Sequence, residues 1–222
     1  MNIKPIKKNL TLKDQAYEAI KQAIYSNSLT PGTPLTEEQL SSTLSISRTP
    51  IRSALQQLVY EKLASKDSTG HIFVSTITEK DVHNATTLRA ILEPMAIETA
   101  VLPISEECLA AFDDLQKRQY ALFLNEPDNN YSYAELDFEF HCLLGKLSDN
   151  ELLANIIRDL NNIMVRIHIL SGTLSSHEQK ALEEHAAIVD YLKKGQIEFA
   201  KLSVQEHTKH VELRIFSQDS SL

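Results

Sequence analysis

The stretch SRTPIRSALQQL, residues 47–58 of this 222-residue chain, predicts the fold of its N-terminal third. Its apolar residues recur at helical spacing and would form one buried face: Ile51, Ala54, Leu55 and Leu58. Pro50 falls in the first turn of this helix, where its missing N–H group costs little. The stretch therefore predicts a short helix that begins just after Ser47.

The segments on either side of this helix are predicted to form two helices before it and a β-hairpin after it. Helical spacing is also found over about 11–27 and over 36–44, and a Thr-Pro-Gly-Thr-Pro run at 30–34 separates these two segments. After Leu63 a short strand, a turn at 67–70 and a returning strand at 72–74 form a β-hairpin. Such an order is typical of a winged helix-turn-helix domain, which we expect over residues 1–77.

The helix after Ser47 is the one expected to enter the major groove of DNA, presenting Arg48, Thr49 and Arg52 from its first turns. Arginine suits this role because its planar fork can meet both acceptors of guanine or grip a phosphate. On spacing alone, these arginines could equally be solvated charges on a helix face. The charge distribution favours nucleic acid: residues 1–77 carry a net charge of +3 and the remaining residues carry −11.

The second part of the chain, residues 78–222, is predicted to be an all-α bundle of six helices. Pro and Gly residues fall between the helical segments, which span about 79–101, 106–124, 129–147, 151–171, 177–194 and 196–216. The expected fold class is therefore mostly α. No apolar run approaches the roughly 18 residues of a membrane-spanning helix. Nor does an apolar stretch follow the basic N-terminus, so we expect a cytoplasmic protein without a membrane partner.

Four polar side chains fall on the apolar stripes of this predicted bundle: Asp137, His141, His185 and His207. Burying such groups is costly unless each finds a partner, and a shared divalent cation would satisfy all four. One carboxylate and three imidazoles suit zinc first, and also Ni, Mn or Fe. The alternative is that each histidine is an ordinary core residue bonded to a carbonyl group.

Two arginines also lie among apolar residues of the predicted bundle. Arg89 and Arg166 each need an anion, which could be a protein carboxylate such as Glu93 or the carboxylate of a ligand. His210 lies one turn from His207 and is a rival metal ligand, although it lies off the apolar stripe. Three other histidines are interpreted as surface or packing residues without a role: His83, His168 and His177.

These motifs resemble those of a known family. The stretch at 47–58, with LTEEQL at 35–40 and GHIFV at 70–74, resembles the winged-helix domain of GntR-type bacterial transcription regulators. The bundle resembles the helical effector-binding FCD domain of the FadR branch. This second resemblance rests on Asp137-x-x-Phe140-His141, Asn150, Glu184-His185 and the last helix with His207.

The resemblance implies a homodimer that binds a palindromic operator in double-stranded DNA, as a repressor controlled by a small organic acid or a related metabolite. It places the metal on the four bundle residues named above, in contact with the carboxylate of that effector. It also implies that the DNA contacts are made by Ser47, Arg48, Thr49, Arg52 and Gly70 at the wing tip. Arg89, and less closely Arg166, match positions that approach the effector.

Two departures from the family pattern concern DNA recognition. Glu38 stands where members often have a DNA-contacting Arg, and Ser53 replaces the usual Glu. The wing, residues 66–70, is also poor in basic side chains.

The sequence contains no nucleophile elbow, phosphate-binding loop, His-Glu-x-x-His or dinucleotide motif, and therefore an enzyme is not expected. Two other readings remain open. A metal-dependent enzyme would need a general base and an open coordination position, and it leaves the N-terminal domain unexplained. A dimerisation scaffold with a structural metal would need neither a general base nor an open coordination position.

Overall fold

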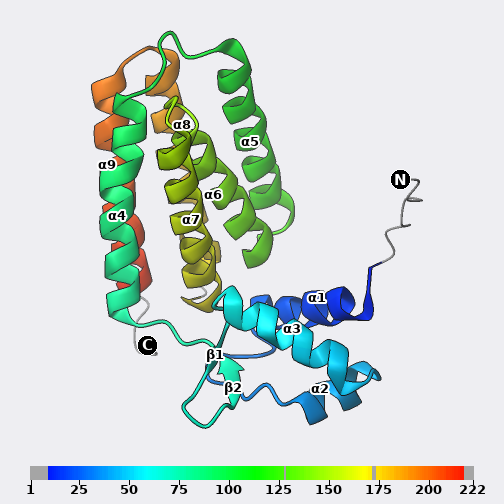
Figure 1. Cartoon of the computed structure of the whole chain (residues 1–222). Helices are drawn as coiled ribbons and strands as arrows, with labels where there is room; N and C mark the ends of the chain where they lie inside the picture. Colours follow the sequence, from blue (N-terminus) through cyan, green and yellow to red (C-terminus); the bar gives the residue numbers. More distant parts are fainter. Residues whose placement is uncertain (1–9, 128, 172–173, 218–222) are drawn as a thin grey trace, which may run out of the picture. The chain divides into compact units, whose positions relative to one another are not determined.

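The computed structural model describes residues 10–127, 129–171 and 174–217 (Figure 1). The chain divides into two compact units, Met1–Thr76 and Ile77–Leu222, which are described separately. Within the first unit the described elements are α1 (Leu12–Tyr25), α2 (Glu37–Leu44), α3 (Arg48–Tyr60), β1 (Ala64–Lys66) and β2 (Ile72–Val74). Those of the second unit are α4 (Glu79–Glu98), α5 (Glu106–Asn125), α6 (Asn130–Gly145), α7 (Glu151–Ser171), α8 (Leu174–Lys193) and α9 (Ile197–Ser217).

The first unit has a small core built on α3, which packs against α1, α2 and β1. The apolar face predicted from the sequence is buried, and Ile24 of α1 joins it at 0% exposure. Between α2 and α3 the chain turns sharply at Ser45, whose φ of 54° is left-handed. This tight turn sets α3 at an angle to α2, as a helix-turn-helix requires.

The wing is a two-stranded antiparallel hairpin in which Ala64 pairs with Val74 and Lys66 with Ile72. Asp67 closes its turn, because the Asp67 carboxylate accepts hydrogen bonds from the backbone N–H groups of Thr69 and His71, both at 2.9 Å. Gly70 follows with φ of 95°, a backbone conformation that glycine adopts without strain. The predicted winged helix-turn-helix is confirmed.

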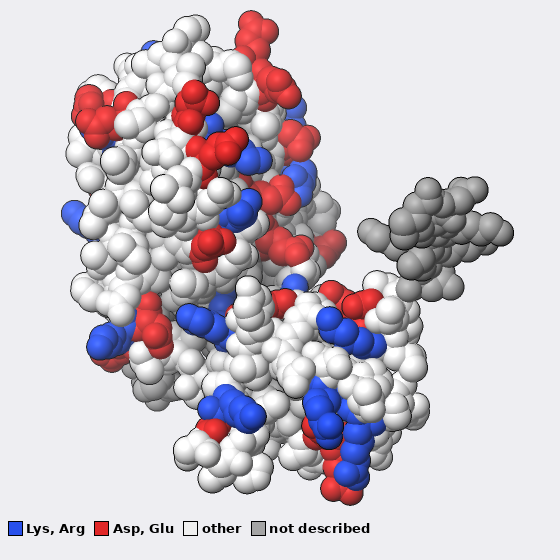
Figure 2. All heavy atoms as spheres, in the orientation of Figure 1, with Lys and Arg blue, Asp and Glu red and all other residues white. Residues whose placement is uncertain are grey.

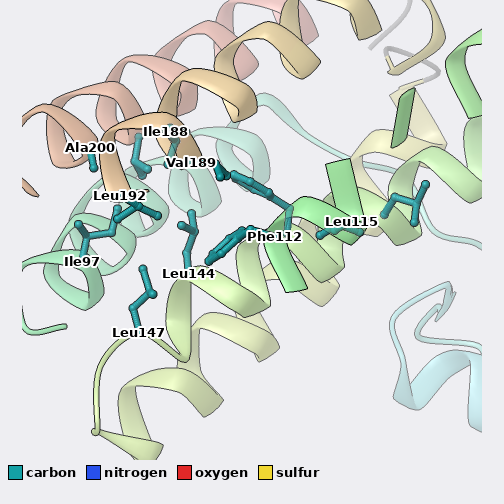
Figure 3. Close-up of a cluster of buried hydrophobic side chains, with 12 residues drawn as sticks. Ile97, Phe112, Leu115, Leu144, Leu147, Ile188, Val189, Leu192 and Ala200 are labelled. Carbon is teal, nitrogen blue, oxygen red and sulfur yellow. The ribbon is translucent and has the colours of Figure 1, made fainter. Parts of the chain in front are cut away.

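The second unit is the predicted all-α bundle, and its helices lie close to the expected ranges. In Figure 1, α6 and α7 pack side by side, α4 runs beside α9, and α5 lies against α6. Figure 3 shows the main apolar core, to which five of the helices contribute. At its centre the rings of Phe112 and Phe140 meet edge to face, with centroids 5.7 Å apart. This core fixes the inner faces of α5, α6, α8 and α9, which also carry polar side chains.

No helix among the described residues is long and apolar enough to cross a membrane. On the face shown in Figure 2, acidic side chains are prominent over the bundle unit, as the net charge of its sequence predicts.

Candidate functional site

The side chains expected to contact DNA lie exposed at the start of α3. Ser47 is the N-cap residue, but its hydroxyl makes no capping hydrogen bond. Arg48 and Thr49 follow in the first turn, and Arg52 lies one turn further on. The structure therefore places these four side chains together on one exposed helix end.

Both arginines are paired with acidic residues of α2. Arg52 donates from Nε and an NH2 nitrogen to the two carboxylate oxygens of Glu37, at 2.7 and 2.8 Å. Arg48 lies 3.5 Å from Glu38, and both of these side chains are mostly exposed. Glu37 thus holds the Arg52 guanidinium in a defined orientation, with one terminal nitrogen left over for another acceptor. Glu38, the departure from the family pattern, reduces the positive charge around Arg48.

In the bundle, the four predicted metal ligands come together from three helices. Asp137 and His141 lie one turn apart on α6, while α8 supplies His185 and α9 supplies His207. All four residues are buried, and one ligand atom from each lies within 4.8 Å of the others. Asp137 Oδ1 is 3.6 Å from Nε2 of both His141 and His185. The cluster could therefore hold a metal ion.

A second layer of side chains orients these imidazoles through their Nδ1 atoms. Nδ1 of His141 lies 3.0 Å from Glu93 on α4, and Nδ1 of His207 lies 2.7 Å from Glu184 on α8. A carboxylate at Nδ1 fixes the proton there and leaves the Nε2 lone pair for a metal, as is usual around ligating histidines. The two glutamates therefore favour the tautomers that a metal site requires.

His185 is fixed mainly by packing. Its ring stacks on Phe140, with centroids 3.8 Å apart and planes 9° apart. The amide nitrogen of Gln119 lies 3.3 Å from Nδ1 of His185, and Oε1 of Gln119 has no hydrogen-bond partner among the described residues. The same amide nitrogen also donates to the carbonyl oxygen of Leu136 at 3.3 Å, so Gln119 links the backbone of α6 to the His185 ring.

Arg89 reaches the same centre from α4. The guanidinium is fully buried, donates from Nε to Glu93 at 3.0 Å, and lies 2.5 Å from Nε2 of His141 through one terminal nitrogen. Its other terminal nitrogen has no hydrogen-bond partner in the described part of the chain. The expected protein partner of Arg89, Glu93, is therefore present, and one donor is still left over.

The surroundings keep the two carboxylates charged and two of the three candidate imidazole ligands neutral, whereas Glu93 and Asp137 raise the pKa of the third, His141, despite its burial. Burial opposes ionisation of Glu93, but the charges of Arg89 and His141 outweigh it and lower its pKa to about 2. The neighbouring imidazoles likewise hold the pKa of Asp137 well below its usual range despite burial. Burial lowers the pKa of His185 strongly and also lowers that of His207. Neutral imidazoles beside an ionised carboxylate are the protonation states that bind a divalent metal.

The unpaired nitrogen atoms of the cluster also fit a bound metal ion. Nε2 of His185 and Nε2 of His207 are both buried without a hydrogen-bond partner among the described residues. Buried nitrogens of this kind are nearly always satisfied in native proteins. A metal ion shared with Asp137 and His141 would satisfy both.

Two other predicted residues, His210 and Arg166, lie outside the cluster of four candidate ligands. His210 is half exposed and its Nδ1 lies 2.8 Å from Glu184, so it supports the second layer and is absent from the ligand cluster. Arg166 is half-buried on α7, where burial lowers its pKa and the charge of Asp81 opposes this effect.

One residue of this centre was missed from the sequence. His168 on α7, interpreted as a surface or packing residue, is buried and its Nε2 lies 3.7 Å from Oδ2 of Asp137. The helical periodicity of the sequence could have predicted its burial, because His168 lies one turn beyond Met164 and two turns beyond Leu160, on the buried stripe of α7. With it, all six bundle helices send at least one polar side chain to this centre.

Family models match both units. A model described as "Bacterial regulatory proteins, gntR family" matches residues 12–74, and a model of the FCD domain matches residues 84–210. Each match falls within one of the two compact units.

Similar proteins are regulators as well. The chain is 29% identical over 197 residues to the HTH-type transcriptional regulator YdhC of Bacillus subtilis, covering 88% of this chain and 87% of YdhC. It is 25% identical over 201 residues to the HTH-type transcriptional repressor RspR of Escherichia coli, covering 90% and 87%. A structure of a GntR regulator from Rhodococcus superposes with a TM-score of 0.69 at 21% identity, covering 93% of this chain and 98% of that one.

Proposed function

Because the chain belongs to the GntR family and carries an FCD domain, it is a DNA-binding transcription regulator, and we propose that a small carboxylate bound at a metal in the bundle controls its operator binding. Repression is the proposed mode of action, supported by the name of RspR. The proposed DNA contacts are Ser47, Arg48, Thr49 and Arg52 of α3, together with Gly70 of the wing.

One observation carries the proposal for the bundle: several buried donor and acceptor atoms at the centre have no hydrogen-bond partner among the described residues. They are Nε2 of His185, Nε2 of His207 and one terminal nitrogen of Arg89. A divalent ion, with zinc as the first candidate, would satisfy the imidazoles and present a positive charge to an effector carboxylate. The leftover N–H donor of Arg89 would then bind that same carboxylate.

The charges around the centre support an anionic ligand. Glu93 and Asp137 carry one negative charge each, whereas a divalent ion and Arg89 together carry three positive charges. Buried charge is costly unless it is balanced, and a monoanion would balance the remainder. In addition, Nε2 of His141 has a single lone pair, which faces one terminal nitrogen of Arg89 in this structure. A metal bound to Nε2 would occupy that lone pair, and this nitrogen of Arg89 would then be available to the effector.

Dimerisation through α4 and α7 is proposed as well. Large apolar side chains are exposed along both helices: Leu88, Ile91, Met95, Leu152 and Ile156. The two helices pack against each other where Ala96 meets Leu153 and Ile157. We call these five exposed residues the α4–α7 patch. A second copy of the chain is the proposed occupant, because a patch of this kind marks an interface and two recognition helices are needed for a palindrome.

The effector proposal is tested by fluorescence anisotropy with a labelled fragment of the DNA upstream of the protein's own gene. Binding is measured with zinc-loaded and with chelator-stripped protein, while small carboxylic acids are titrated in. We expect an acid to change the DNA affinity of the zinc-loaded form only. An equal effect on both forms would show that the metal is structural and that the effector binds elsewhere.

A further inference from the structure

Residues 10–77 of the winged-helix unit carry no net charge, although this unit binds DNA. They contain six Lys or Arg side chains and six Asp or Glu side chains. The net charge of +3 over residues 1–77 comes from Lys4, Lys7 and Lys8, which lie outside the described residues. Because DNA of any sequence is bound mainly through Lys and Arg contacts to phosphate, the balanced charge implies weak attraction of these residues for non-operator DNA.

Two of the six acidic side chains lie beside the arginines at the start of α3. Glu37 and Glu38 are the first two residues of α2, where the positive end of the helix dipole favours a negative charge. Glu37 is bound by Arg52 through two hydrogen bonds. Glu38 is much more open, because its side chain is 81% exposed and its Oε1 lies 3.5 Å from a terminal nitrogen of Arg48. Glu38 therefore places an exposed negative charge next to an arginine that is proposed to contact DNA.

This charge acts differently on the two kinds of DNA contact that are open to Arg48. A phosphate is an anion that every sequence presents, and a phosphate that reached Arg48 would also come close to the Glu38 carboxylate. Such a distance is well within the screening length of about 8 Å at physiological salt, so the two anions repel each other. Guanine instead presents uncharged acceptors, N7 and O6, to an arginine in the major groove. Glu38 thus disfavours phosphate contacts of Arg48 more than base contacts.

The difference matters when operator DNA is compared with DNA of other sequence. On the operator, a base engages Arg48, and removing the charge of Glu38 adds no phosphate contact through this arginine. On other DNA, Arg48 has no matching base, and without the charge of Glu38 it can turn to a phosphate. Glu38 should therefore weaken binding to non-operator DNA more than binding to the operator.

We propose that Glu38 is a specificity-determining residue, which favours the operator over other DNA by keeping Arg48 from phosphate contacts. This inference rests on the proposed function, because it requires Arg48 to contact a base of the operator. Two competing roles are separable by experiment. Glu38 could accept a hydrogen bond from the amino group of a cytosine, or it could act only through the net charge of the unit.

The test compares the affinity of the full-length protein for operator and scrambled duplexes by fluorescence anisotropy at several salt concentrations. The operator is the sequence that the wild-type protein enriches from a pool of random duplexes, and the scrambled duplex has the same length and base composition. Glu38→Gln removes the charge and keeps the approximate shape of the side chain. Glu18→Gln is the matched control, because Glu18 is an exposed carboxylate on α1 of the same unit. Arg48→Ala, alone and combined with Glu38→Gln, shows whether Glu38 acts through Arg48.

We expect Glu38→Gln to bind the scrambled duplex about threefold or more tightly than the wild type does, with a slope of log K against log salt that is steeper by about 0.9 per chain. Operator affinity should change less, so the ratio of operator affinity to scrambled affinity falls. Glu18→Gln should keep the ratio of the wild type. Arg48→Ala should bind the operator more weakly, and adding Glu38→Gln to it should leave the ratio unchanged.

An unchanged ratio in Glu38→Gln, together with a loss of operator affinity in Arg48→Ala, would overturn the inference and leave the proposed DNA contact standing. An equal fall of the ratio in Glu18→Gln would overturn it as well, because only net charge would then matter. Weaker operator binding by Glu38→Gln, with no gain on the scrambled duplex, would identify Glu38 as a base contact instead. Unchanged operator affinity in Arg48→Ala would contradict the proposed role of Arg48 itself.

Discussion

At the scale of single residues, Arg52 is a surface charge that we propose to act as a recognition group for DNA. Glu37 grips it through two hydrogen bonds, so the guanidinium is held over the exposed end of α3 before DNA arrives. Holding a long side chain in place reduces the entropy lost on binding. Glu37 therefore acts as a positioning residue for Arg52.

Replacing Arg52 by Ala is expected to weaken specific DNA binding by about 1–3 kcal/mol, because a base or phosphate contact is lost. Anisotropy titrations at several salt concentrations measure this loss. Arg118→Ala is a matched control, because Arg118 makes an equivalent two-bond surface pair with Glu139 in the bundle unit. Unchanged operator affinity in Arg52→Ala would contradict the assignment of α3 as the recognition helix.

The proposed metal ligands are tested by the double substitution His185→Ala with His207→Ala. It removes two of the four ligand atoms, and we expect zinc binding to fall from about one ion per chain to none, with a lower melting temperature in zinc. Inductively coupled plasma mass spectrometry of the dialysed protein measures the metal. His83→Ala is the control, because that histidine is exposed and pairs with Glu212 outside the cluster. Full occupancy in the double variant would rule out the site.

At the scale of helices, α6 carries two of the proposed ligands because residues four apart share a face, and we expect α4 to determine how the site is regulated. Its inner face carries Arg89 and Glu93, which reach His141, and its outer face carries Ile91 and Met95 of the α4–α7 patch. A single helix therefore joins the proposed effector site to the proposed dimer interface. A ligand that moves Arg89 can change how two copies pack.

The α4–α7 patch is tested by Ile91→Glu. Ile91 is 59% exposed, so a charge there should leave the folded monomer intact while disfavouring burial against a second copy. We expect light scattering after size exclusion to show a shift from dimer to monomer, together with weaker DNA binding. Leu124→Glu on α5 is the control, since it makes the same change at a residue that is 62% exposed. A dimer that persists in Ile91→Glu would place the interface elsewhere.

At the scale of the whole molecule, pH should act on the protein through the buried centre. Protons compete with the metal for the imidazoles, so metal affinity falls as pH falls. Burial lowers the pKa of His185 and His207, which keeps both rings neutral below pH 6.5, whereas Asp137 stays ionised to still lower pH. Bound zinc, and the stability it adds, should therefore be retained at pH 7 and lost near pH 5.

Zinc content after dialysis at a series of pH values, together with melting temperatures, measures this dependence. Without zinc the melting temperature should lose most of its difference between pH 7 and pH 5. Retention of all the zinc at pH 4 would contradict histidine ligation. Loss that is already complete at pH 7 would show that the imidazoles are not kept neutral by burial.

Thermodynamic linkage relates the effect of the effector on operator binding to the effect of operator DNA on effector binding. If the effector weakens operator binding by some factor, operator DNA must weaken effector binding by the same factor. Measuring the acid titration with and without saturating operator DNA provides this comparison. If the metal holds the effector carboxylate, operator DNA should no longer change the effector affinity in a metal-stripped protein.

The sequence by itself determined the order of elements and most of the residues that meet in the buried polar cluster. Local signals were sufficient for α3, since the periodicity around residues 47–58 and the tight turn before it act over a few residues. The six bundle helices were predicted for the same reason. Asp137, His141, His185 and His207 were found because a polar residue on an apolar stripe is visible without knowing the partner helix.

The tertiary structure alone decided which polar residues share one centre and which atoms remain unpaired. His168 lies on a buried stripe, yet its position opposite Oδ2 of Asp137 depends on how α7 packs against α6. Glu184 lies beside a predicted ligand in the sequence, but it serves a different one, His207, because α8 and α9 pack together. Pairings of this kind arise from contacts between helices far apart in the chain, and the periodicity of one helix carries no information about its neighbours.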